Sequence, residues 1–207
     1  MPRTVRAPAA PAEFRVDRTA LPGTHRLLEV FPGLDRLPAF ARLPGTERAR
    51  RRLARVTKVR IAPGRGWMYV APHALPEFLR RAGVTLWLAP DDVVVVGRHH
   101  LARSARLVLY MDILHELCHV LQRWDGEDLW KEGYRYGDRP TEIRAYRFAV
   151  ELGREQGATE AFLRGYLRVE WIGPKEYRTL LRGAGVAVRG ERRPPAARAR
   201  GRPEPAA

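Results

Sequence analysis

Residues 107–122 constrain the fold of this chain more than any other segment. Apolar side chains recur there at alternating spacings of four and three, which is the period of a helix with one buried face. They are Leu107, Met111, Leu114, Cys118 and Leu121. A neighbouring stripe holds Asp112, His115, His119 and Gln122. The pattern predicts a long amphipathic helix whose polar groups lie at the border of the core, where a cleft would run.

Two histidines of this predicted helix are spaced to share one metal ion. Residues 115–119 read H-E-x-x-H, and positions four apart lie on one face of a helix, so both imidazoles can reach a single ion. Glu116 is rotated about 100° from His115, which leaves its carboxylate beside the ion and not bound to it. The alternative is a pair of histidines at the edge of the core with satisfied hydrogen bonds.

A catalytic zinc site needs a third protein ligand and an open position, and Glu142 is the candidate. It lies 23 positions after His119, near the start of a second predicted helix. We expect Asp138 to cap that helix, Pro140 to begin it and Gly153 to end it. One face of the helix holds Glu142, Ala145, Tyr146 and Ala149. The alternative is an ordinary first-turn glutamate that offsets the helix dipole.

Two other histidines are set aside as ligands. In one unbroken helix from Leu101, His99 would lie 16 residues before His115. That separation is about 24 Å at 1.5 Å per residue, too far for a shared ion. We therefore interpret His99 and His100 as residues at the end of a strand or the start of a helix.

The two predicted helices together resemble zincin metallopeptidases whose third ligand is a glutamate. Residues 115–122 read HELCHVLQ and residues 140–146 read PTEIRAY, similar to small bacterial zincins with H-E-L-x-H-V-x-Q and then P-x-E-x-x-A-Y. Residues 142–152 also resemble a helix of the ImmA/IrrE peptidases, with Tyr146 where that family has asparagine. The pentapeptide HELCH recurs in SprT-like proteases, whose third histidine has no counterpart after His119.

The resemblance implies a zinc-dependent metallopeptidase that binds one zinc ion per chain and hydrolyses a polypeptide substrate. It implies that His115, His119 and Glu142 hold the zinc. It also implies that Glu116 is the general base, which takes a proton from the activated water and later passes it to the leaving amine.

A tyrosine is the candidate group for stabilising the oxyanion, because a phenol can donate to a developing alkoxide. Tyr146 lies one turn after Glu142 on the same helical face, so we expect it near the metal. Tyr134 and Tyr136 are the alternatives. The other interpretation of Tyr146 is a packing aromatic with a solvated hydroxyl.

The net charge of +15 is concentrated towards the ends of the chain. Residues 1–60 hold 14 Lys and Arg against 5 Asp and Glu, whereas residues 61–182 hold 18 against 16. The basic run of residues 48–55 is either a solvated face or a contact with nucleic acid or an acidic partner through residues 1–60. An alternative function is therefore a nucleic-acid-associated or regulatory zincin-like protein that acts by binding through basic arms.

The sequence predicts an α+β fold of the zincin-like kind with disordered termini. By the resemblance, residues 53–188 are expected to form the metallopeptidase domain, in which a small mixed sheet packs on the H-E-x-x-H helix and on the second helix. Residues 1–52 are expected to be a basic, largely disordered arm, and residues 189–207 a disordered tail rich in Arg, Pro and Ala.

Short apolar runs and turn residues predict the remaining elements. Strands are expected over residues 56–61, 66–70, 84–88 and 92–96, the last two as a hairpin. Further helices are expected over residues 47–55, 76–82, 158–170 and 174–181. Trp171 is expected to anchor the last two helices to the core. By the resemblance, one of the strands binds substrate through main-chain hydrogen bonds.

The cysteine count and hydropathy bear on the compartment. Cys118 is the only cysteine, so no intrachain disulfide can form. Residues 1–18 have no continuous apolar region, and no run of 18 apolar residues exists, so neither a secretory signal nor a membrane span is expected. We expect a cytoplasmic protein without membrane contact.

Overall fold

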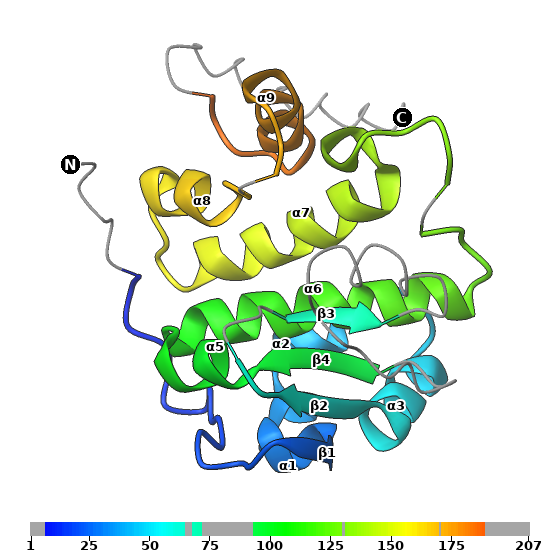
Figure 1. Cartoon of the computed structure of the whole chain (residues 1–207), viewed down its shortest axis with the longest axis vertical. Helices are drawn as coiled ribbons and strands as arrows, with labels where there is room; N and C mark the ends of the chain where they lie inside the picture. Colours follow the sequence, from blue (N-terminus) through cyan, green and yellow to red (C-terminus); the bar gives the residue numbers. More distant parts are fainter. Residues whose placement is uncertain (1–6, 65–67, 72–92, 130, 170, 189–207) are drawn as a thin grey trace, which may run out of the picture.

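The computed structural model describes residues 7–64, 68–71, 93–129, 131–169 and 171–188 (Figure 1). This part of the chain is an α+β fold, as predicted. A long helix, α6 (Arg106–Trp124), lies between a small sheet and a second long helix, α7 (Pro140–Glu155). The remaining C-terminal helices, α8 (Glu160–Tyr166) and α9 (Pro174–Gly183), pack beyond α7 (Figure 1).

The sheet is mixed, with four strands in the order β1-β2-β4-β3. The strands are β1 (Gly23–Arg26), β2 (Lys58–Ala62), β3 (Met68–Ala71) and β4 (Val93–Gly97). β4 pairs with β2 in parallel and with β3 antiparallel, while β1 pairs with β2 antiparallel. The small mixed sheet was predicted, and its valine-rich strand is central. The predicted strand 84–88 and helix 76–82 lie outside the described residues.

The hydrophobic core extends through the N-terminal segment, so a largely disordered arm over residues 1–52 is wrong for the described part of it. This segment folds into α1 (Leu27–Val30), the 3₁₀ turn η1 (Leu34–Arg36), α2 (Pro38–Ala41) and α3 (Glu47–Val56). The core includes Phe14, Leu27, Val30, Phe31, Leu34, Leu37, Phe40 and Leu43. Burying one large apolar side chain stabilises a fold by about 1.5–3 kcal/mol. The burial of these side chains therefore holds the Pro- and Gly-rich segment on the core, although its backbone is irregular.

Tyr110 of α6 is a main contact for this N-terminal segment. Its ring stacks on Phe14 with centroids 4.3 Å apart, and Phe31 meets it edge-on at 5.8 Å. The Tyr110 hydroxyl donates a hydrogen bond of 2.7 Å to the carbonyl of Arg15. The division expected at residues 52 and 53 therefore does not separate two structural units in the described chain.

A break in the chain precedes α6. Helix α5 (Arg98–Arg103) is followed by Ser104 in an extended conformation, and α6 begins at Arg106 after its N-cap, Ala105. Arg18 donates hydrogen bonds of 3.0, 2.7 and 2.7 Å to the carbonyls of Leu101, Ala102 and Ser104. The guanidinium thus satisfies carbonyls that the end of α5 leaves without helical partners. The unbroken helix assumed for the His99 separation is not present.

Helix α7 begins at Pro140, as expected, but its predicted cap and end are wrong. Arg139 is the N-cap and makes no side-chain capping bond, because Asp138 belongs to a preceding 3₁₀ turn, η2 (Tyr136–Asp138). The helix continues through Gly153 to Glu155. A Cβ atom on Gly153 would lie 2.9 Å from Leu163 Cδ2 and 3.1 Å from Met111 Cε. Gly153 therefore permits close packing and does not terminate the helix.

The C-terminal helices form where predicted, with differences in the length of α8 and in the role of Trp171. Helix α8 is shorter than residues 158–170, and Thr159 caps it by accepting a hydrogen bond from the Phe162 amide. Trp171 is 51% exposed and meets Tyr136 edge-on at 5.7 Å. It therefore covers a neighbouring aromatic ring and does not anchor the helices to the core.

Among the described residues, no helix combines the length and the apolar composition that crossing a membrane requires.

Candidate metal centre

Helices α6 and α7 bring His115, His119 and Glu142 into one buried cluster. The Nε2 atoms of the two histidines are 3.0 Å apart. Glu142 Oε2 lies 3.5 Å from each of these nitrogens. One ligand atom from each residue lies within 4.8 Å of the others. The three predicted ligands therefore meet at one point, although Glu142 is 23 positions beyond His119.

The spacing of these three atoms fits a small divalent cation. Ligands about 2.1 Å from a tetrahedral zinc ion lie about 3.4 Å from one another. The observed separations of 3.0, 3.5 and 3.5 Å lie on either side of that value. Glu142 Oε2 is buried and has no hydrogen-bond partner among the described residues. A bound cation would give this buried oxygen a direct partner.

Gln122 orients one of the imidazoles and was not assigned a role from the sequence. His119 Nδ1 lies 2.8 Å from Gln122 Oε1, and Gln122 Nε2 donates 3.1 Å to the carbonyl of Thr141. Because the amide oxygen accepts from Nδ1, neutral His119 has its lone pair on Nε2, facing the cluster. Gln122 therefore sets the tautomer and also ties α6 to the first turn of α7. Its place three residues after His119 was the signal available in the sequence.

The buried side chains of His119 and Glu142 shift one another's pKa values. Burial by itself lowers the pKa of His119, but the Glu142 carboxylate outweighs that effect and raises the pKa to about 9. Burial alone would raise the pKa of Glu142, yet the two neighbouring imidazoles hold it well below its usual range. The carboxylate is therefore ionised and offers an anionic ligand atom to a cation.

Glu116 lies beside the cluster without belonging to it. Its Oε1 atom is 3.9 Å from His115 Nε2, and its side chain is buried. Since the carboxylate is next to the three candidate ligands, it can exchange a proton with a small molecule bound among them.

Two tyrosines form one wall of the site. The ring of Tyr146 lies 4.2 Å from the ring of His115 at an angle of 53°. Its hydroxyl is 2.7 Å from the hydroxyl of Tyr136. Burial, followed by the nearby Glu142 carboxylate, raises the pKa of both phenols well above the ordinary value. Both therefore remain protonated donors. Tyr134 is 42% exposed, and no contact places it in this wall among the described residues.

A second polar network, missed from the sequence, lies one turn before the cluster. His100 Nε2 is 2.8 Å from Asp112 Oδ2, and Ser104 Oγ is 2.9 Å from His100 Nδ1. Tyr166 contacts Tyr146 edge-on at 6.2 Å, and burial together with the Asp112 carboxylate raises the Tyr166 pKa. The break after α5 brings His100 back to α6, and no local sequence pattern predicted that turn.

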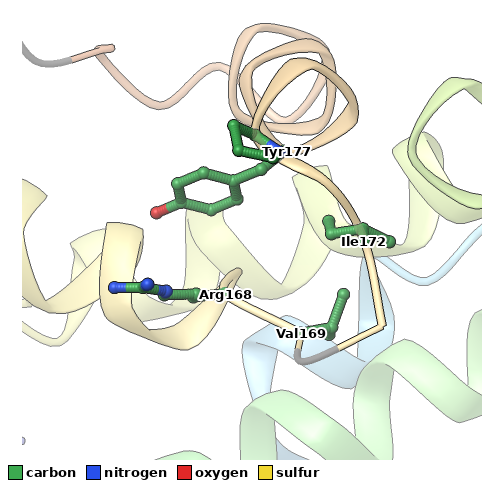
Figure 2. A pocket seen from close by; sticks show the side chains of 5 residues that line it. Arg168, Val169, Ile172 and Tyr177 are labelled. Carbon is green, nitrogen blue, oxygen red and sulfur yellow. The ribbon is translucent and has the colours of Figure 1, made fainter.

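A separate open hollow lies between the end of α8 and the start of α9 (Figure 2). Its lining residues are Arg168, Val169, Ile172, Pro174 and Tyr177. Figure 2 shows the side chains of Tyr177 and Arg168 extending in the same direction, with Tyr177 above Arg168 in the view. None of these five residues belongs to the His115, His119 and Glu142 cluster. The buried cluster, and not this hollow, carries the candidate chemistry.

No protein-family model matches the chain. No curated protein and no solved structure matches it either. The assignment of a function therefore depends on the residues of the site and on their geometry.

Proposed function

We propose that this protein is a zinc-dependent peptidase of the zincin type. The observation that carries the proposal is the buried convergence of His115, His119 and Glu142 from two adjacent helices, with Glu116 beside them. Two imidazoles and one carboxylate are a ligand set that zinc favours. Three protein ligands also leave a coordination position for a reacting molecule, whereas structural zinc sites use four.

The side chains would divide the work of peptide hydrolysis. When bound, zinc supplies Lewis acidity, which polarises a carbonyl and lowers the pKa of water to about 7. Glu116 is a general base held outside the ligand set, where it accepts a proton from the attacking water and returns it to the departing amine. Its burial near His115 keeps bulk water from competing for that proton.

Tyr146 is the proposed oxyanion donor, with Tyr136 as its positioning partner. The pKa of each phenol is far above neutrality, so both hydroxyls carry a proton at pH 7. Their contact of 2.7 Å uses one of these two protons. The other proton is available to a developing negative charge next to His115.

Strand β3 is the proposed binding edge for an extended polypeptide. It pairs with β4 and is the end strand of the described sheet. It also packs along α6, the helix that carries both histidines (Figure 1). A substrate strand added to this edge would be held by main-chain hydrogen bonds that read no particular sequence.

Metal content and hydrolysis, measured on the same preparations, test the proposal. The wild-type chain and Glu116→Gln should each bind about one zinc by mass spectrometry, and Glu142→Ala should bind far less. Glu116→Gln should also lower hydrolysis of casein and of a quenched random-peptide mixture by about 10²–10⁴-fold. Glu151→Ala, at an exposed position of the same helix as Glu142, is the matched control and should retain both properties.

Three outcomes would overturn the proposal. If wild-type protein purified without chelators contains no zinc, the proposed metal centre is refuted. Equal hydrolysis by wild type and Glu116→Gln would show that the activity does not arise at this site. Stoichiometric zinc with no cleavage of any peptide would favour the alternative, a zincin-like protein that acts by binding.

A further inference from the structure

We propose that α3 and the C-terminal end of α6 form a binding site for a single strand of nucleic acid. The two helix segments line one open hollow, to which α6 contributes Trp124 and its C-cap residue Asp125. Four exposed arginines, here called the arginine face, contribute from α3: Arg48, Arg51, Arg52 and Arg55. The inference is independent of the peptidase proposal, because it uses no residue of the metal centre.

The arginine face is not explained by the stability of α3. Arg48 lies three and four residues before Arg51 and Arg52, and these lie four and three residues before Arg55. The side chains at these spacings are neighbours on the helix surface and repel one another. Arg48 also stands in the first turn, where positive charge opposes the helix dipole. Glu47 is the one acidic residue of α3, and it pairs with Arg51. A bound polyanion would relieve this repulsion.

Arg50 of the same helix provides a contrast. Its guanidinium donates hydrogen bonds of 2.9 and 2.5 Å to the carbonyls of Leu43 and Gly45, so it holds the loop before α3. For Arg48 and Arg55, the described residues provide neither an ion pair nor a hydrogen bond. Arg50 therefore has a structural role, whereas the guanidinium donors of Arg48 and Arg55 are directed to solvent.

An aromatic ring within the basic hollow favours a single strand over other anionic partners. The Arg52 guanidinium lies 4.7 Å from the centre of the Trp124 ring, a cation–π contact that holds the guanidinium inside the hollow. Sites for single strands combine a basic groove along the backbone with aromatic side chains. An acidic peptide would also need apolar pockets, and the apolar residues of this hollow are Ala49 and Trp124.

The hollow lies at the end of the helix that carries the metal ligands. Trp124 follows His119 by five positions on α6, which is about 7.5 Å along the axis. A strand bound there would rest next to the metal centre without entering it. Asp125 is the acidic residue of the α6 wall, so phosphates are expected to contact the α3 wall.

Fluorescence anisotropy with a labelled 20-nucleotide thymidine strand tests the site on the full-length chain. The variant is Arg48→Gln/Arg51→Gln/Arg55→Gln. The matched control, Arg36→Gln/Arg103→Gln/Arg178→Gln, removes the same charge from exposed positions elsewhere. Each single-strand phosphate contact contributes about 0.7 to the slope of log K against log salt, so the variant should lose about 2 from that slope. Affinity at 0.1 M salt should then fall about 100-fold, while the control stays close to wild type.

Several results would overturn the inference. Equal losses in variant and control would show that binding depends on overall charge. Tighter binding of the matched duplex would exclude a single-strand site. Competition by polyglutamate as strong as by thymidine strands of equal charge would instead indicate an acidic protein partner. Circular dichroism checks that α3 is intact, and Arg48→Gln/Arg55→Gln, which keeps the Glu47 pair, should give about two-thirds of the slope change.

Discussion

Zinc should stabilise the folded chain, and Glu142→Gln should remove most of that gain. Glutamine keeps the shape of Glu142 but lacks the anionic oxygen that lies 3.5 Å from both imidazole nitrogens. Each protein is compared with its own metal-free form, so that any effect of the substitution on the fold itself cancels.

The magnitude follows from linkage. At a free zinc concentration 100 times its Kd, one site stabilises the native state by about 2.7 kcal/mol. For a chain of this size, each kcal/mol raises Tm by about 2–4 °C, so the wild-type gain is about 5–11 °C. Losing a group outside the ligand set already weakens metal binding by about 10–100-fold. A lost ligand should weaken it by at least about 100-fold, which leaves about 0.4 kcal/mol, or 1–2 °C.

Differential scanning fluorimetry in a buffered zinc series measures both gains. Glu151→Gln, exposed on the same helix, controls for the loss of a negative charge. If zinc raises the Tm of Glu142→Gln as much as that of wild type, Glu142 is not a ligand. If zinc raises neither Tm, the buried cluster does not bind zinc, and the distance argument for the site fails.

Four further predictions concern the same helices and the core. Gln122→Ala should weaken zinc about 10–100-fold in competition with a chromophoric chelator, because His119 loses the acceptor at Nδ1. Metal-free His119, with a pKa of about 9, is protonated at pH 7, so zinc should displace one proton. Affinity should therefore rise about tenfold per pH unit up to pH 9 and then level off, as calorimetry in buffers of different ionisation enthalpy would show. Phe14→Ala should lower the free energy of unfolding in urea by about 3–5 kcal/mol, since Phe14 is buried against Tyr110. A change below about 0.5 kcal/mol would mean that the N-terminal segment is not packed. Gly153→Ala should destabilise by about 1–3 kcal/mol in the same assay despite the better helix propensity of alanine, because the new Cβ would overlap Leu163.

Adding Gln122→Glu to this series distinguishes two causes for a loss of zinc affinity in Gln122→Ala. Gln122 contacts both His119 and the Thr141 carbonyl. Gln122→Glu keeps an acceptor for Nδ1 but loses the donor to Thr141. Recovery of zinc affinity in Gln122→Glu would assign the effect to the imidazole tautomer, and no recovery would assign it to the contact between α6 and α7.

The local pattern of the sequence was sufficient to predict the two helices that hold the candidate ligands. The spacing of apolar residues predicted α6 over residues 107–122, close to the observed Arg106–Trp124. Pro140 marked the start of α7, and its position placed Glu142 in the first turn. These features depend on interactions between residues three or four apart, so a single segment contains the information.

Only the tertiary structure decided which distant segments meet. The valines of β4 are central because β2 and β3, more than 20 residues earlier in the chain, pair on either side. Phe14 packs on Tyr110, Gln122 reaches Thr141, and Arg18 closes the end of α5. Each contact joins residues whose own neighbours in the sequence give no sign of the partner. Their positions are set by how whole elements bury apolar surface together, and that is a property of the assembled core and not of any one segment.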